Sequence, residues 1–218
     1  MNSPLIQLLV LAAIAVFLIL RLKNVLGTRE GFEEPATNVP PVPRKGPAFE
    51  VIEGGPDLDI TDHFEDGSPQ ARALAEMKRI QPSFNVTEFL AGARGAYEMI
   101  VMGFERGELD EIKPFLTDEI YESFVDGVAI REDQGLTIEA NFIGVREMSL
   151  DNVTLDPETK EAEMTLRFVA QLTQAVRNSD GEIVEGSITD AKKQKDTWVF
   201  ARIMGSDDPN WFLVSTDG

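Results

Sequence analysis

Four side chains in this sequence have the chemistry for proton transfer, namely Tyr97, Tyr121, Asp118 and Asp126. In an apolar cavity, an aspartate can accept a proton and a tyrosine hydroxyl can donate one. Structural roles also explain them: both tyrosines fall on the apolar face of a predicted helix, where a phenol packs in the core. Asp118 follows Thr117, a predicted helix cap, and a carboxylate there suits the helix dipole. We therefore expect no catalytic residue and no enzyme.

Other reactive groups are few. The chain has no cysteine, which excludes thiolate catalysis, disulfides and cysteine-bound metals. Its one histidine, His63, lies in an acidic tract, and a single imidazole offers too little for a metal site or a Ser-His-Asp triad. Gly92 and Gly95 fall inside a predicted helix, which indicates close helix packing and not a phosphate-binding loop. We expect no metal and no cofactor.

The charge of the chain restricts its partners. The formal net charge is −18, and residues 81–218 carry 12 Lys and Arg against 27 Asp and Glu. Phosphate backbones and anionic lipid surfaces repel such a domain, which excludes nucleic acid as a partner and disfavours lipid. Complementary charge favours a partner with basic segments.

An apolar run near the N-terminus predicts a membrane span. The run extends from Leu5 to Leu20 with Gln7 as its one strongly polar residue, which is close to the length that crosses a bilayer. A buried core helix is an alternative, and so is a cleavable signal peptide, although that would begin with positive charge. The flanking cations all follow the run and predict an N-terminus outside the cytoplasm, with the rest of the chain inside. These cations are Arg21, Lys23 and Arg29.

Three parts follow from these patterns: an anchor at 1–24, a linker at 25–67 and a domain at 68–218. The linker is rich in proline, glycine and acidic residues, which break regular elements and favour an extended tether. Within the linker, residues 49–53 could form a short strand or a docking motif, or be plain linker.

The first half of the domain reads as helices. Ser68 and Pro69 predict the start of a helix that reaches about residue 80. Asn85 and Glu88 have capping-box spacing ahead of a long amphipathic helix that ends near Gly107. A helical turn is expected over 109–116, and another helix follows Thr117. Its predicted apolar face comprises Ile120, Tyr121, Phe124, Val125 and Val128.

The second half changes to the alternation of strands. Strands are predicted over 137–150, with a bulge near Gly144, and over 164–173. Two more are predicted over 197–202 and 211–214, with turns at residues 156–158 and 180–181. Helices followed by an antiparallel meander predict an α+β domain.

Two stretches resemble the Tim44-like domain family, which includes the import-motor anchor of the mitochondrial inner membrane and membrane-anchored relatives in alphaproteobacteria. One is FNVTEFLAGARGAYEMIVMGFERGELDEIKPFLTDEIYESF at 84–124. The other comprises DTWVF at 196–200 and DPNWFLV at 208–214. The resemblance covers about residues 68–218. It implies a cone-shaped fold of the nuclear-transport-factor-two-like kind, in which a curved antiparallel sheet wraps around helices.

For function, the resemblance implies an adaptor at the bacterial inner membrane that works with translocation or assembly proteins. The family's long chaperone-binding region is replaced here by the span and linker, so that property is not carried over. Two alternatives stay open: a cone that binds a lipid tail or apolar peptide, and a cone-fold enzyme. Bulky residues expected to line a cone are Phe104, Phe124, Phe142, Phe168, Trp198 and Trp211. The cations Arg72, Lys78 and Arg79 form either a solvated helix face or a lipid contact.

Overall fold

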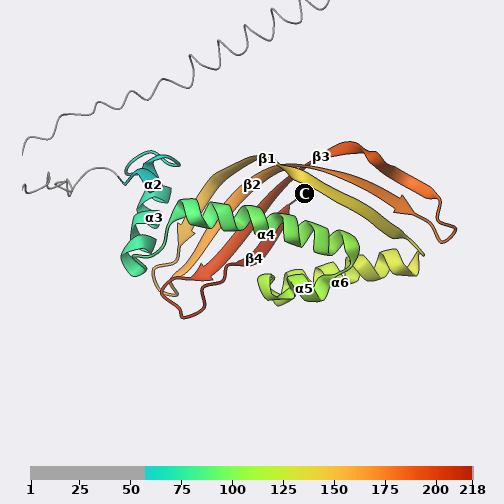
Figure 1. Cartoon of the computed structure of the whole chain (residues 1–218). Coiled ribbons are helices and arrows are strands. Elements are labelled where there is room, and N and C mark those ends of the chain that lie inside the picture. Colours follow the sequence, from blue (N-terminus) through green and yellow to red (C-terminus); the bar gives the residue numbers. More distant parts are fainter. Residues whose placement is uncertain (1–56, 218) are drawn as a thin grey trace, which may run out of the picture. The chain divides into compact units, whose positions relative to one another are not determined.

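A computed structural model describes residues 57–217, and it confirms the predicted α+β class (Figure 1). No helix in this range is both long and apolar enough to cross a membrane. The predicted anchor at 1–24, with Arg21, Lys23 and Arg29, and the linker up to residue 56 lie outside the described residues. The elements in chain order are α2 (Leu58–Thr61), α3 (Pro69–Ile80), α4 (Val86–Arg106), α5 (Leu109–Ile112), η1 (Lys113–Phe115), α6 (Asp118–Asp133), β1 (Thr137–Leu155), β2 (Glu161–Arg177), β3 (Ile183–Ile203) and β4 (Phe212–Asp217).

The four strands form one antiparallel meander in the order β1-β2-β3-β4. The register of β1 shifts between Phe142 and Gly144, which confirms the predicted bulge. Bulges bend a strand and increase its twist, and the sheet is correspondingly curved, with α4 along its concave side (Figure 1).

Strand β3 is much longer than the sequence predicted. It begins at Ile183, whereas the alternating pattern indicated a strand only from Thr197. The missed half pairs with β2 alone, because β4 pairs with β3 only from Thr197 onward. Its side chains are mostly exposed and rich in lysine, so the alternation of a half-buried strand is absent there.

Helix α4 follows the predicted signals. The side chain of Asn85 accepts a hydrogen bond from the Glu88 amide at its start, and Gly107 ends it with a φ of +74°. Fully buried side chains on one face of α4 pack against β1 and β2, with Tyr97 and Ile100 at their centre.

The described residues before residue 68 contain a short helix. Residues 57–67, assigned to the linker by their composition, contain α2, and Ile60 of this helix is buried in the core. Asp59 accepts hydrogen bonds from the amides of Val86 (2.8 Å) and Thr87 (3.0 Å), so it caps α4 from outside that helix. Lys78 of α3 pairs with the same carboxylate at 2.8 Å. Burial raises the pKa of Asp59, but the hydrogen bonds from Lys78, Val86 and Thr87 outweigh it and hold this pKa at about 2.

Two glycines of α4 do not have the predicted role. Cβ atoms added at Gly92 and Gly95 would meet nothing within 4 Å, so these positions face open space and allow no close packing. The close approach occurs at Gly103, where a Cβ would lie 2.6 Å from Cγ2 of Ile112 on α5. Helices α4 and α5 therefore meet over Gly103.

Helix α6 begins at the predicted place but packs loosely. None of its residues is fully buried, and Val125 and Ile130 are exposed. Thr117 occupies the N-cap position, yet its hydroxyl donates to the carbonyl of Leu213 on β4 and does not cap the helix. The predicted apolar face thus covers part of the core while leaving apolar surface open.

Candidate functional site

The centre of the domain holds a buried tyrosine–carboxylate pair. Tyr97 of α4 is fully buried and stacks on Phe168 of β2, with ring centroids 4.3 Å apart. Its hydroxyl donates a hydrogen bond to Oδ2 of Asp196 on β3. Burial, followed by the bond to Asp196, raises the pKa of Tyr97 well above its ordinary range. Tyr97 therefore stays a neutral donor that holds the carboxylate in place.

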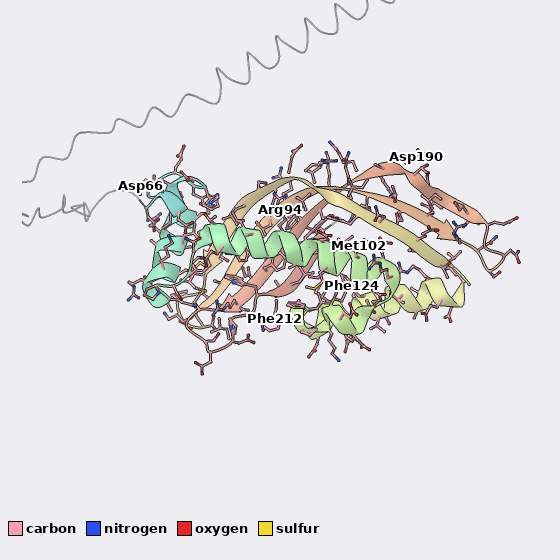
Figure 2. All side chains as sticks on the ribbon, in the orientation of Figure 1. Asp66, Arg94, Met102, Phe124, Asp190 and Phe212 are labelled. Atoms are coloured by element: carbon pink, nitrogen blue, oxygen red, sulfur yellow. The ribbon has the colours of Figure 1, made fainter. Side chains whose placement is uncertain are left out.

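Asp196 is 6% exposed and faces a pocket of about 320 Å³ on the concave side of the sheet. We call this the Asp196 pocket. Its walls come from α4, α6, β3 and β4. Phe124, labelled in Figure 2, projects from α6 toward Phe104 of α4, and the ring centroids are 4.7 Å apart. The lining residues are Ile100, Val101, Phe104, Glu105, Phe124, Gln194, Asp196, Trp198 and Thr216.

The two acids of the Asp196 pocket differ in how their charge is compensated. Glu105 pairs with Arg131 of α6 at 3.9 Å and accepts a hydrogen bond from Gln174. Asp196 has no cationic partner among the residues that the structure describes. Besides Tyr97, its described side-chain partner is the amide of Gln194, at 3.2 Å. A buried carboxylate with only neutral donors is open to a cation, because an uncompensated buried charge is unfavourable.

Of the four residues considered for proton transfer, only Tyr97 belongs to the tyrosine–aspartate pair. Asp118 and Asp126 are exposed on α6, and Tyr121 lies beneath the ammonium of Lys113 at 4.6 Å from the ring centroid. These three residues form no shared site. Tyr97 donates its hydroxyl hydrogen to Asp196 and is not among the residues that line the Asp196 pocket.

The six predicted aromatic residues separate into different places. Phe104, Phe124 and Trp198 line the Asp196 pocket, and Phe168 lies in the core beside Tyr97. Phe142 and Trp211 line other pockets. The first, of about 370 Å³, lies between α4, α5 and β1. The second, of about 240 Å³, lies where Trp211 contacts Phe89, with ring centroids 4.7 Å apart.

An acidic surface covers α5, α6 and the residues next to them. Between residues 108 and 133 there are nine carboxylates and two cations, and all nine carboxylates are exposed. The cations, Lys113 and Arg131, contact Tyr121 and Glu105. Within residues 57–217, only Glu108 of the nine forms an ion pair, with Arg106 at 3.8 Å. We call this the acidic helix surface; its members are Glu108, Asp110, Glu111, Asp118, Glu119, Glu122, Asp126, Glu132 and Asp133.

The cations of α3 are largely engaged within the domain. Lys78 pairs with Asp57 and Asp59, and Arg79 pairs with Glu76, whereas Arg72 is exposed. His63 lies in the turn after α2, and no group of three potential metal ligands occurs within the described part of the chain. Ion pairing with neighbouring acids leaves this face with little free positive charge.

Asp196 was missed by reasoning from the sequence alone. The predicted strand began at Thr197, so the alternation of inward residues was not followed back to Gln194 and Asp196. Once β3 is known to continue, residues 194, 196, 198 and 200 share its inward face, and an aspartate among them is the unusual member. An acid on the inward face of a strand is the signal that could have identified the site.

Comparisons with known proteins agree with the resemblance seen in the sequence. The family model described as "Tim44-like domain" matches residues 70–218. The human mitochondrial import inner membrane translocase subunit TIM44 is 25% identical over 136 residues, which are 61% of this chain and 29% of the human protein. The match thus spans less than a third of that relative. The intermembrane-space region of the chloroplast protein ARC6 has a TM-score of 0.34 and 12% identity, with 50% of this chain and 75% of that chain covered.

Proposed function

The chain belongs to the family of Tim44-like domain proteins, and on that premise we propose that it is a membrane-anchored adaptor. Its domain recruits partner proteins at the bacterial inner membrane, in protein translocation or membrane-protein assembly. The domain takes the nuclear-transport-factor-two-like cone as its fold, which the helices on the concave side of a curved sheet support. The chain acts by binding and not by catalysis.

The acidic helix surface is the observation that carries the proposal. Eight of its nine carboxylates form no ion pair with any residue that the structure describes. Helix α6, which carries most of this surface, also exposes the apolar side chains of Val125 and Ile130. A predominantly acidic surface that also exposes apolar side chains is complementary to a basic amphipathic segment. We therefore infer that the partner presents a segment rich in lysine and arginine, and that α6 receives it.

The membrane attachment is proposed from the sequence. Residues 1–24 span the inner membrane with the N-terminus on the periplasmic side, because Arg21, Lys23 and Arg29 follow the apolar run. The domain then lies in the cytoplasm, where a partner approaches it. Alkaline carbonate should leave the full chain in the membrane fraction and release a chain that lacks residues 1–24; equal release of both would refute the anchor.

Charge neutralisation with a matched control tests the adaptor role. In the full chain, Asp118, Glu119 and Glu122 are changed to Asn, Gln and Gln, which removes three carboxylates from α6. The control changes Glu158, Glu161 and Glu163 to Gln, which removes the same charge from the exposed β1–β2 turn and the start of β2. We expect co-purification of partners from native membranes to fall about tenfold in the first variant only. If co-purification falls equally in both variants, the effect comes from the net charge of the chain and not from α6. If it falls in neither variant, the proposal is refuted.

A further inference from the structure

We propose that the Asp196 pocket receives the cationic end of a lysine or arginine side chain from the partner segment. This inference rests on the proposed function, because it concerns the same partner. It adds a specific anchor point to an otherwise general charge attraction, and it assigns a chemical class of ligand to a pocket inside the domain.

Asp196 has no cationic partner among the described residues to compensate its charge. This carboxylate is 94% buried, from its exposed fraction of 6%, and it accepts hydrogen bonds from two neutral groups, the hydroxyl of Tyr97 and the amide of Gln194. Neither donor supplies positive charge. The neighbouring acid Glu105, by contrast, already has Arg131. A cation that enters the pocket thus gains its strongest interaction at Asp196, where no described residue competes for the charge.

Most of the other walls of the Asp196 pocket are aromatic or aliphatic. Phe104, Phe124 and Trp198 provide aromatic faces, and Ile100 and Val101 provide aliphatic ones. A cation is attracted to an aromatic face, and the guanidinium of Arg131 already lies 4.6 Å from the centroid of Phe104. Apolar walls with one carboxylate that lacks a cationic partner fit an apolar stem that ends in a positive charge, which describes the side chains of lysine and arginine. The volume of about 320 Å³ is within the range of ligand pockets.

The pocket and the acidic helix surface share α6. Phe124 lines the pocket, whereas Glu122 and Asp126 lie two positions from it, on the opposite and exposed face of the helix. A basic segment bound to that face must therefore extend around α6 for one of its side chains to enter the pocket. The aromatic and aliphatic walls accommodate an apolar stem, which favours a side chain of the partner over a free small cation as the occupant.

A fixed acceptor that only orients Tyr97 is the competing explanation for Asp196. It predicts that substitution changes stability and leaves ligand binding untouched. The two explanations separate in a binding assay with Trp198 as the reporter. Because the chain has two tryptophans, Trp211→Phe leaves Trp198 as the single one.

The probe is n-butylguanidinium, and its uncharged isostere n-butylurea is the control ligand. The full chain with Trp211→Phe is titrated in nonionic detergent at constant ionic strength while Trp198 fluorescence is followed. We expect saturable binding of n-butylguanidinium with a Kd on the order of 1 mM, and none of n-butylurea. Asp196→Asn, which keeps an oxygen for Tyr97, should raise this Kd about tenfold or more. Phe124→Leu should weaken binding without altering Asp196. Thermal unfolding of each variant verifies that it is folded.

Four outcomes would overturn the inference. Equal binding of n-butylurea would show that charge is not recognised, and an unchanged Kd in Asp196→Asn would show that this carboxylate is not the recognising group. Failure of saturating n-butylguanidinium to reduce partner capture from membranes would refute the partner side chain and leave a free cation as the ligand. If the probe does not bind while neutralisation of α6 still abolishes capture, the anchor point fails and the adaptor role stands. If capture is insensitive to α6, the adaptor role itself fails.

Discussion

Asp59 should contribute about 2 kcal/mol to the stability of the domain, although it precedes the segment matched by the family model. Its pKa is about 2 in the folded domain against 3.8 for an ordinary aspartate. A difference of this size corresponds to about 2 kcal/mol of stabilisation at neutral pH. Because the folded pKa is the lower one, the stabilisation is present above the unfolded value and is lost as the pH falls through the folded value. About half of it should be gone at about pH 3.

Asp59→Asn tests this reasoning. Urea unfolding of the full chain in nonionic detergent can be followed by fluorescence, because both tryptophans lie in the domain. The variant should lose about 1–2 kcal/mol at about pH 7, since asparagine can still accept one of the hydrogen bonds, and the difference from the natural chain should shrink toward about pH 3. Asp62→Asn, an exposed neighbour, removes the same charge and should change stability by less than about 0.5 kcal/mol.

Two results would refute the account of Asp59. Equal losses in Asp59→Asn and Asp62→Asn would show that only net charge matters. A loss of the same size at about pH 3 as at about pH 7 would show that the ionised carboxylate is not the stabilising form.

The remaining predictions concern α4. Gly95→Ala should raise the free energy of unfolding by about 0.5–1 kcal/mol in urea, because the added Cβ meets open space and alanine favours helix; a loss of stability would contradict the open position. Gly103→Ala should lower the free energy of unfolding by about 1–3 kcal/mol, because its Cβ would lie 2.6 Å from Cγ2 of Ile112. An unchanged free energy of unfolding would show that α5 moves away without cost. Tyr97→Phe should destabilise by about 1–3 kcal/mol because it removes a donor from buried Asp196. The pKa of Tyr97 is raised, so the natural chain should lose stability above about pH 10, where the unfolded tyrosine ionises first. The same Tyr97→Phe change should leave tyrosinate absorbance of the folded protein unchanged below about pH 11, and a difference there would show that Tyr97 ionises in the fold.

Local signals predicted much of the fold. The caps at Ser68 and Asn85, the αL glycine Gly107 and the bulge at Gly144 are each specified by a few neighbouring residues, and the structure contains all of them. The first half of β3 was missed because its side chains are polar and exposed, and it is pairing with β2 across the adjacent hairpin, not an alternating apolar pattern, that makes it a strand.

The site needed contacts that composition does not encode. The proline, glycine and aspartate residues before residue 68 read as linker, yet Asp59 gains its role from Val86 and Thr87, which lie 27 and 28 positions away. Tyr97 and Asp196 are 99 positions apart, so their pairing follows from the register of β3 beneath α4. The acidic character of α6 could be read from the sequence directly, because it depends on residue type alone.

Site-specific photo-crosslinking from α6 tests the adaptor claim most directly. A photoreactive residue replaces Ser123, which is exposed between Glu122 and Phe124, and a control probe replaces Glu158 in the β1–β2 turn. After irradiation of native membranes, mass spectrometry identifies the captured peptide. We predict that the probe at Ser123 captures one defined segment rich in lysine and arginine, that the control does not, and that about 0.5 M NaCl abolishes the adduct. Capture of the same proteins from both positions, or adducts whose captured segments carry no excess of basic residues, would contradict the claim.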